Sequence, residues 1–126
     1  MFIEMHGEGG KPLVVIRGAG GLGQGGASAC NLMPRPSDYG RVIFVEWEND
    51  ERSDGFGAYA KRADDVVGML TCFEIGRADF LDISRGGWTI LQIAIRHPGV
   101  IDSIVPVCRR GLGCGLSCVR FWKFRN

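Results

Sequence analysis

The fold of this chain is decided by the stretch Phe80-Leu81-Asp82-Ile83-Ser84-Arg85-Gly86-Gly87-Trp88. Its residues up to Ile83 are typical of a strand, and a helical pattern of apolar side chains begins at Gly86. Ser84 lies between them, on a sharp turn from strand to helix. Such a turn holds a serine hydroxyl out of the sheet, where a substrate can reach it. The stretch therefore predicts a nucleophile elbow, with Ser84 as the candidate catalytic residue.

The segments on either side of this stretch alternate between strand and helix patterns. Unbroken apolar runs such as Leu13–Ile16 are typical of strands that are covered on both faces, and such strands belong to parallel sheets. Strands that alternate with helices predict right-handed crossovers. The predicted fold class is therefore α/β, with a mostly parallel sheet flanked by helices and a short antiparallel strand at the start. The expected strands are Phe2–Met5, Leu13–Ile16, Arg41–Glu46, Arg77–Ile83 and Ile101–Val107, and the expected helices are Ala58–Glu74 and Gly86–His97.

The longer of the two predicted helices has one apolar face. Gly76 follows this helix and is predicted to cap its C-terminal end, because glycine readily adopts the left-handed backbone conformation found there. The members of the apolar face recur at helical spacing and are Ala63, Val66, Val67, Leu70 and Phe73.

The length and the charge distribution predict one domain followed by a tail. The 126 residues are enough to bury a modest core. Residues 1–102 carry ten Lys or Arg and all fourteen Asp or Glu, a net charge of −4, whereas residues 103–126 carry five Lys or Arg and no acid, a net charge of +5. We expect residues 1–108 to form an α/β domain and residues 109–126 to form a basic, irregular tail, because the tail shows neither strand nor helix periodicity.

Composition and short patterns exclude several classes of protein. No apolar run approaches the roughly 20 residues of a membrane span, and the N-terminal residues lack the pattern of a secretory signal. We therefore expect a cytoplasmic protein with no membrane contact, and we expect no cofactor, no metal and no nucleic-acid partner. The cysteines are odd in number and form no CxxC pair, which predicts neither a disulfide framework nor a zinc site; they are Cys30, Cys72, Cys108, Cys114 and Cys118.

A glycine-rich loop, Gly18-Ala19-Gly20-Gly21-Leu22-Gly23, directly follows the first of the apolar strands. It matches the dinucleotide pattern G-x-G-x-x-G, and Glu46 ends the next strand 23 residues past Gly23, where a ribose-binding acid is expected. The backbone N–H groups of such a loop can instead form an oxyanion hole, in which each donor contributes on the order of 3 kcal/mol in the transition state. A plain turn that binds nothing is the third interpretation. We favour the oxyanion loop, because the dinucleotide pattern should open a helix and leaves the elbow unexplained.

With the elbow, the glycine loop and their spacing in view, the chain resembles the N-terminal half of an α/β-hydrolase over residues 2–107. The segment Ile83–Pro98, which is similar to the family's elbow and its helix, is the most specific part. The resemblance implies a partial α/β-hydrolase fold of the esterase or lactonase type and the hydrolysis of an ester or similar small substrate. It also implies Ser84 as the nucleophile and the backbone N–H groups of Ala19 and Arg85 as the oxyanion donors.

The sequence departs from the family's pattern at positions that matter for catalysis. Asp82 stands where the family has the first glycine of the elbow, and Arg17 stands where it has a histidine. After Ser84 the chain contains one acid, Asp102, and one histidine, His97. Asp102 is expected at the wrong end of the sheet and His97 at the far end of the helix that follows the elbow. No acid or base of a catalytic triad is therefore predicted.

A serine hydroxyl is a weak nucleophile unless a base takes its proton. We therefore expect a truncated and impaired serine hydrolase, and the activity of this chain alone is left open. One alternative is a non-catalytic α/β fragment that self-associates through the strand Ile101–Val107, which would be an uncovered apolar sheet edge. The other alternative is a dinucleotide-binding domain that uses the loop Gly18–Gly23.

Overall fold

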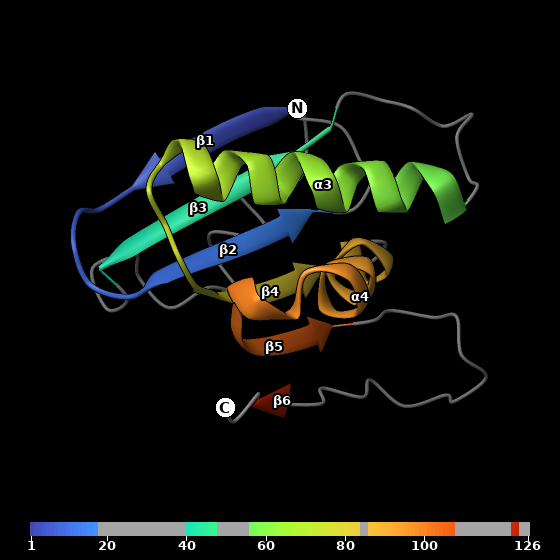
Figure 1. The fold of residues 1–126 in the computed structure, drawn as a ribbon. Helices are drawn as coiled ribbons and strands as arrows, with labels where there is room; N and C mark the ends of the chain where they lie inside the picture. The colour runs from blue at the N-terminus through green and yellow to red at the C-terminus, as the bar shows by residue number, and fades with distance from the viewer. Residues whose placement is uncertain (18–39, 48–55, 84–85, 108–121, 124–126) are drawn as a thin grey trace.

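The computed structural model describes residues 1–17, 40–47, 56–83, 86–107 and 122–123, and these ranges form a single sheet with helices on it (Figure 1). The predicted alternation of strands and helices is confirmed. The elements are β1 (Phe2–His6), β2 (Pro12–Arg17), β3 (Arg41–Glu46), α3 (Phe56–Cys72), β4 (Ala78–Ile83), α4 (Gly86–Arg96), the 3-10 helix η1 (Pro98–Val100), β5 (Ile101–Val107) and β6 (Trp122–Lys123).

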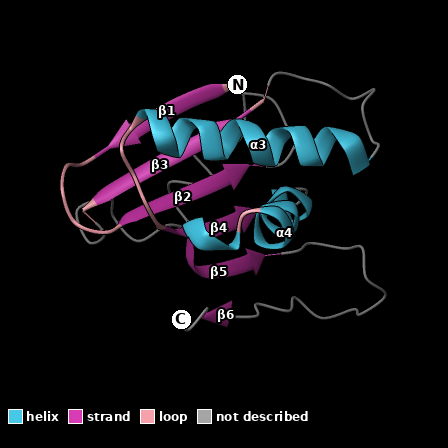
Figure 2. Cartoon of the chain, viewed as in Figure 1, coloured by secondary structure: helices cyan, strands magenta, loops and turns pink. Residues whose placement is uncertain are grey.

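The sheet is mostly parallel, as the sequence predicts. Its six strands follow the order β1-β3-β2-β4-β5-β6. The pairs β2–β3, β2–β4 and β4–β5 are parallel, whereas the outer strands β1 and β6 run antiparallel to their neighbours (Figure 2). The antiparallel strand expected at the start of the chain is therefore β1. Helices α3 and α4 lie on the same face of the sheet.

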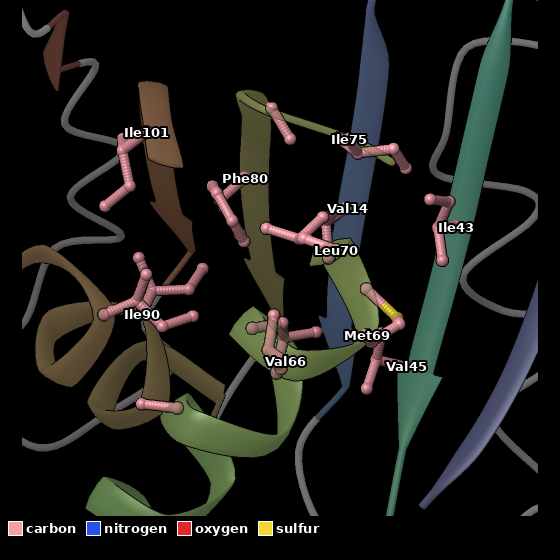
Figure 3. Packing of buried hydrophobic residues seen from close by; sticks show 14 of the residues in the cluster. Val14, Ile43, Val45, Val66, Met69, Leu70, Ile75, Phe80, Ile90 and Ile101 are labelled. Carbon is pink, nitrogen blue, oxygen red and sulfur yellow. The ribbon is translucent and has the colours of Figure 1, made fainter. Parts of the chain in front are cut away.

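The main core lies between the sheet and the two helices (Figure 3). From α3 it receives Ala63, Val66, Met69 and Leu70, all at most 4% exposed. The predicted apolar face is wrong at Phe73, which is 39% exposed because α3 ends at Cys72 and the chain turns away. Met69 belongs to the face instead. The sheet residues of this core include Val14, Ile16, Ile43, Val45 and Phe80.

The opposite face of the sheet is buried as well. The alternate residues of β2 and β3 form a second apolar cluster there, with Leu81 packed against it. Burial on both faces is the reason that these strands read as unbroken apolar runs. The cluster consists of Leu13, Val15, Val42 and Phe44.

The C-terminal end of α3 is capped by Glu74, and the prediction of a Gly76 cap is wrong. Glu74 has a φ of 55°, in the left-handed region. Its N–H donates to the carbonyl of Thr71 at 3.1 Å, and the N–H of Ile75 donates to the carbonyl of Leu70 at 2.8 Å. These two bonds form a Schellman motif, in which the left-handed position usually holds glycine. Ile75 and Leu70 are both buried and close the apolar side of the motif.

Glu74→Gly is expected to raise the free energy of unfolding by about 1 kcal/mol, because glycine adopts the left-handed conformation without the steric cost that other residues carry. Urea denaturation measures the change. Gly76→Ala is the matched control, since its Cβ would meet nothing within 4 Å and its φ is not left-handed. It is not expected to lower the stability. A loss with Gly76→Ala, or with Glu74→Gly, would contradict the assignment of the cap.

The sequence predicts an uncovered sheet edge at β5, but this edge is partly covered in the structure. β6 pairs with it, and the register partners are Ser103 with Lys123 and Ile104 with Trp122. The segment predicted as an irregular tail therefore supplies a short strand that covers part of the β5 edge. Self-association through a sheet edge stays a prediction.

Candidate functional site

The carboxyl ends of β2 and β4 lie side by side in the sheet. Their last residues, Arg17 and Ile83, are register partners, as are Ile16 and Asp82 one step earlier. Strand β3, which follows β2 in the chain, lies on the side of β2 that faces away from β4. Strand β5, which follows β4, lies on the side of β4 that faces away from β2. Ligands of open α/β sheets bind outside the carboxyl ends of two such strands. This edge of the sheet is therefore the candidate functional site.

Two residues separate β4 from α4. Since β4 ends at Ile83 and α4 begins at Gly86, only Ser84 and Arg85 stand between a strand and a helix. This is the spacing that the elbow prediction requires. The predicted site residues Ser84 and Arg85, together with Ala19 of the glycine loop, lie outside the described residues, and their roles stay predictions.

Asp82 is buried beside the start of α4. None of its surface is exposed, and it lies on the same face of the sheet as Phe80, which α4 covers. A Cβ on Gly87, the second residue of α4, would approach Asp82 Oδ2 to 2.5 Å. The carboxylate thus occupies the space that a side chain at position 87 would need. The N-terminal end of a helix also favours a nearby negative charge. Because position 87 has no side chain, a carboxylate fits at position 82, where the family has glycine.

Gly87→Ala is expected to lower the free energy of unfolding by about 2 kcal/mol, because its methyl group would collide with a short, buried side chain. In an Asp82→Ala background this loss should largely disappear, which urea denaturation of the four chains measures as a coupling energy. Gly68→Ala in α3 is the matched control. Its Cβ would meet nothing within 4 Å, so a gain of about 0.5–1 kcal/mol is expected. Equal losses from Gly87→Ala in both backgrounds would rule out the contact.

Charged side chains form a network at the opposite, amino-terminal end of the strands. Arg77 Nε donates a hydrogen bond of 2.7 Å to Asp102 Oδ1. Lys11 Nζ lies 3.1 Å from Asp79 Oδ2 and 3.3 Å from Asp102 Oδ2. Asp102 is thus held by two cations at the far end of the sheet from the elbow, as the sequence predicts for its position.

The same carboxylate belongs to a β-bulge. Ala78 pairs with Ile101 and Asp79 pairs with Ser103, so Asp102 is an extra residue on β5. The hydroxyl of Ser103 donates a hydrogen bond to Asp79 across the two strands. The ion pairs of Asp102 and this hydrogen bond together fix the register with which β4 and β5 continue towards the candidate site.

The network shifts the pKa values of Asp102 and Lys11. Burial alone would raise the pKa of Asp102, but the hydrogen bond from Arg77 and the hydrogen bond and charge of Lys11 outweigh it, and the pKa lies below its usual value. The hydrogen bond to Asp79 is the largest cause that raises the pKa of Lys11. A carboxyl whose pKa is lowered by folding stabilises the protein above its unfolded-state pKa, and this contribution is lost as the pH falls through the folded-state value.

Asp102→Asn is expected to lower the free energy of unfolding at pH 7 by about 1 kcal/mol, because Arg77 and Lys11 lose a charged partner. The difference from the unmodified chain should shrink as the pH falls below about 4, because the carboxyl is then protonated in the unfolded chain first and in the folded chain, where its pKa is lower, at a lower pH. Urea denaturation between pH 3 and pH 7 measures both effects. Asp65→Asn should show no such difference, since Asp65 makes no ion pair within the described part of the chain. A difference that stays constant with pH would contradict the assigned role of the charge.

Both histidines of the chain lie beside carboxylates away from the candidate site. His6 Nε2, in β1, lies 2.7 Å from Glu4 Oε1. His97 Nε2 lies 2.8 Å from Asp64 Oδ1, and Arg96 donates to the other oxygen of Asp64 at 2.8 Å. His97 follows the last residue of α4, about 16 Å along the helix from its first residue. Neither histidine is therefore placed to take a proton at the predicted elbow.

Four side chains that no motif in the sequence predicts come together near the carboxyl ends of the strands. Arg62 Cζ lies 5.4 Å from the ring centroid of Trp47 and 5.5 Å from that of Tyr59. The rings of Tyr59 and Trp88 have centroids 6.5 Å apart. These four residues, called the Arg62 cluster below, come from the end of β3, from α3 and from the first turn of α4. In the sequence, this cluster is signalled only by the spacing of Tyr59 and Arg62, which places them on one helix face. The other contacts of the cluster depend on tertiary packing.

The described part of the chain shows no site for a metal ion, since no group of three or more His, Cys, Asp or Glu side chains is arranged to hold one there. Cys72, at the end of α3, is an exposed free thiol. No helix within the described ranges is long and apolar enough to cross a membrane.

Comparison with known proteins points to hydrolases. No protein-family model matches the sequence. The chain is 28% identical over 109 residues to a curated protein of Agrobacterium fabrum that is named as a carbamate hydrolase, RutD. The aligned part covers 83% of this chain and 42% of that protein. The chain thus spans less than half the length of this relative.

Solved structures share the fold. A carboxylesterase structure from the thaumarchaeon Nitrososphaera gargenis is 26% identical with a TM-score of 0.66, over 83% of this chain and 40% of that one. An α/β-hydrolase enzyme from the sediment metagenome of the Mar Chica lagoon, Morocco, is 19% identical with a TM-score of 0.58, over 82% of this chain and 46% of that one. The mostly parallel sheet with its flanking helices is therefore an arrangement known from hydrolases.

Proposed function

Because this chain belongs to the α/β-hydrolase fold family, we propose that it is a serine hydrolase that acts on an ester or a similar small substrate. Ser84 is the proposed nucleophile. The backbone N–H groups of Ala19 and Arg85 are the proposed oxyanion donors. Related proteins with this fold include enzymes named for the hydrolysis of carbamates, carboxylic esters and lactones.

The register of β2 and β4 is the observation that carries the proposal. Arg17 and Ile83 are partners across the two strands, and Gly18 and Ser84 are the residues that follow them. Neighbouring strands lie about 4.8 Å apart, so the glycine loop and the serine start from adjacent positions. Acyl transfer requires such proximity, because a nucleophile and the oxyanion donors must both come within about 3 Å of one reacting carbonyl group.

In the proposed reaction the hydroxyl oxygen of Ser84 attacks the carbonyl carbon of the ester. The two N–H groups donate hydrogen bonds to the carbonyl oxygen, on which negative charge develops. The alcohol leaves with a proton, and water then hydrolyses the acyl-enzyme. The serine proton needs a base, and both histidines and Asp102 are engaged elsewhere. We therefore propose slow, impaired turnover, because oxyanion donors and binding alone sustain only residual catalysis.

The chain is expected to release about one equivalent of p-nitrophenol from p-nitrophenyl butyrate in an initial burst, followed by much slower turnover. Stopped-flow or conventional absorbance measures the burst, and Ser84→Ala should abolish it. Ser103→Ala is the matched control, because Ser103 bonds to Asp79 at the amino-terminal end of the sheet and should leave the burst unchanged. A fluorophosphonate probe should label the unmodified chain and spare Ser84→Ala.

Release that is equally fast with Ser84→Ala would refute the nucleophile and leave only the fold. The alternatives would then be self-association through a sheet edge and dinucleotide binding by the loop Gly18–Gly23. That loop lies outside the described residues, whereas Glu46, the acid that a dinucleotide site would use, is 8% exposed at the end of β3. Both alternatives stay predictions.

A further inference from the structure

Among the described Lys and Arg side chains that have a partner, Arg62 is held by a different kind of contact. Lys11, Arg77 and Arg96 each form ion pairs with aspartates. Arg62 instead lies over the rings of Trp47 and Tyr59, and no carboxylate within the described ranges pairs with it. Its side chain is partly exposed. A guanidinium group whose described partners are aromatic rings keeps N–H donors for another group.

The position of the Arg62 cluster relates it to the proposed nucleophile. Ile16 of β2 pairs with Val45 of β3 and with Asp82 of β4, so these two residues lie at the same level of the sheet. Trp47 stands two residues after Val45, and Ser84 stands two residues after Asp82. The two strands are separated by one strand, which corresponds to roughly 10 Å. The cluster therefore lies roughly 10 Å from the position at which the chain leaves β4, a distance that a small substrate can span.

Aromatic side chains continue from Arg62 towards the elbow. Tyr59 contacts Arg62 on one side and Trp88 on the other. Trp88 is 40% exposed and belongs to the first turn of α4, which begins two residues after Ser84 in the chain. A substrate that reached from Ser84 to Arg62 would thus lie along apolar rings and end at a positive charge.

We propose that Arg62 binds a carboxylate group at the end of the substrate that is distant from the scissile bond. This inference rests on the proposed function and specifies its substrate class, an ester or lactone that also carries a carboxylate. The carboxylate accepts hydrogen bonds from the edge of the guanidinium group, whose planar fork matches two carboxylate oxygens. Trp47 and Tyr59 hold the guanidinium group through cation–π contacts, and the rings of Tyr59 and Trp88 contact the apolar part of the substrate.

Isothermal titration of the full chain with sodium benzoate tests the site, with benzamide as the neutral analogue. We expect saturable benzoate binding that weakens at least about tenfold in Arg62→Met, because hydrogen bonds to a charged group contribute that much affinity. Arg62→Lys should weaken it less, since it keeps the charge and loses the planar fork. Arg96→Met is the matched control. Arg96 binds Asp64 at the other end of α4, and its removal should leave benzoate binding unchanged.

Three results would overturn the inference: benzoate binding that survives in Arg62→Met, benzamide binding as tight as benzoate, or inorganic phosphate binding tighter than benzoate. If the Arg62 variants fail to fold by circular dichroism, the unmodified chain still decides the question. Benzoate should then shift the indole N–H resonance of Trp47, assigned with Trp47→Phe. An unchanged resonance at saturating benzoate would refute the site.

A kinetic comparison separates this inference from the proposed function. The burst rate with the p-nitrophenyl half-ester of glutarate should fall about tenfold in Arg62→Met, and the rate with neutral p-nitrophenyl butyrate should fall much less. A Ser84-dependent burst without this difference refutes the inference alone. Benzoate binding that depends on Arg62, in a chain that shows no burst, refutes the hydrolase and with it the assignment of the carboxylate to a substrate.

Discussion

The candidate site depends on the backbone pairing of β2, which is hydrogen-bonded to β3 on one side and to β4 on the other. This double pairing brings the carboxyl ends of three strands to one level. Burial on both faces fixes the register of β2. A slip of one residue would move each side chain of this strand to the opposite apolar cluster, where it does not fit the packing. The clusters take alternate residues of β2, with Val14 and Ile16 on one face and Leu13 and Val15 on the other.

The two ends of the sheet use their charges differently. At the amino-terminal end, Lys11 and Arg77 are neutralised by Asp79 and Asp102, and the pairs tie β2, β4 and β5 together. At the carboxyl end, Arg62 rests on aromatic rings. Charges that pair within the protein stabilise the strand register, whereas an arginine whose described partners are aromatic rings keeps hydrogen-bond donors for a ligand. The proposed recognition site and the stabilising ion pairs therefore lie at opposite ends of one sheet.

Much of the fold could be predicted because strands buried on both faces leave a simple signal. Arg41–Glu46 and Ile101–Val107 have the predicted bounds. Arg41–Glu46 has an unbroken apolar run at its centre, and Ile101–Val107 follows a Pro-Gly pair that ends the preceding helix. The features that the sequence did not reveal depend on contacts between distant segments. The left-handed conformation of Glu74 goes against the preference of its residue type, and β6 is too short to show a period. The Arg62 cluster likewise joins three elements. The role of Ser84 was predicted from the strand–turn–helix pattern and the family resemblance, the roles of Ala19 and Arg85 follow from the resemblance alone, and all three stay predictions.

The contact between Asp82 and Gly87 makes the substitutions that the two positions tolerate depend on each other. With any side chain at position 87, a carboxylate at position 82 would meet an atom at a distance that real Cβ contacts do not show, unless one of the two groups shifts. A side chain at position 87 therefore costs stability while Asp82 is present, and this cost falls when position 82 changes as well. The pair is thus epistatic, because a substitution at one position changes the effect of a substitution at the other.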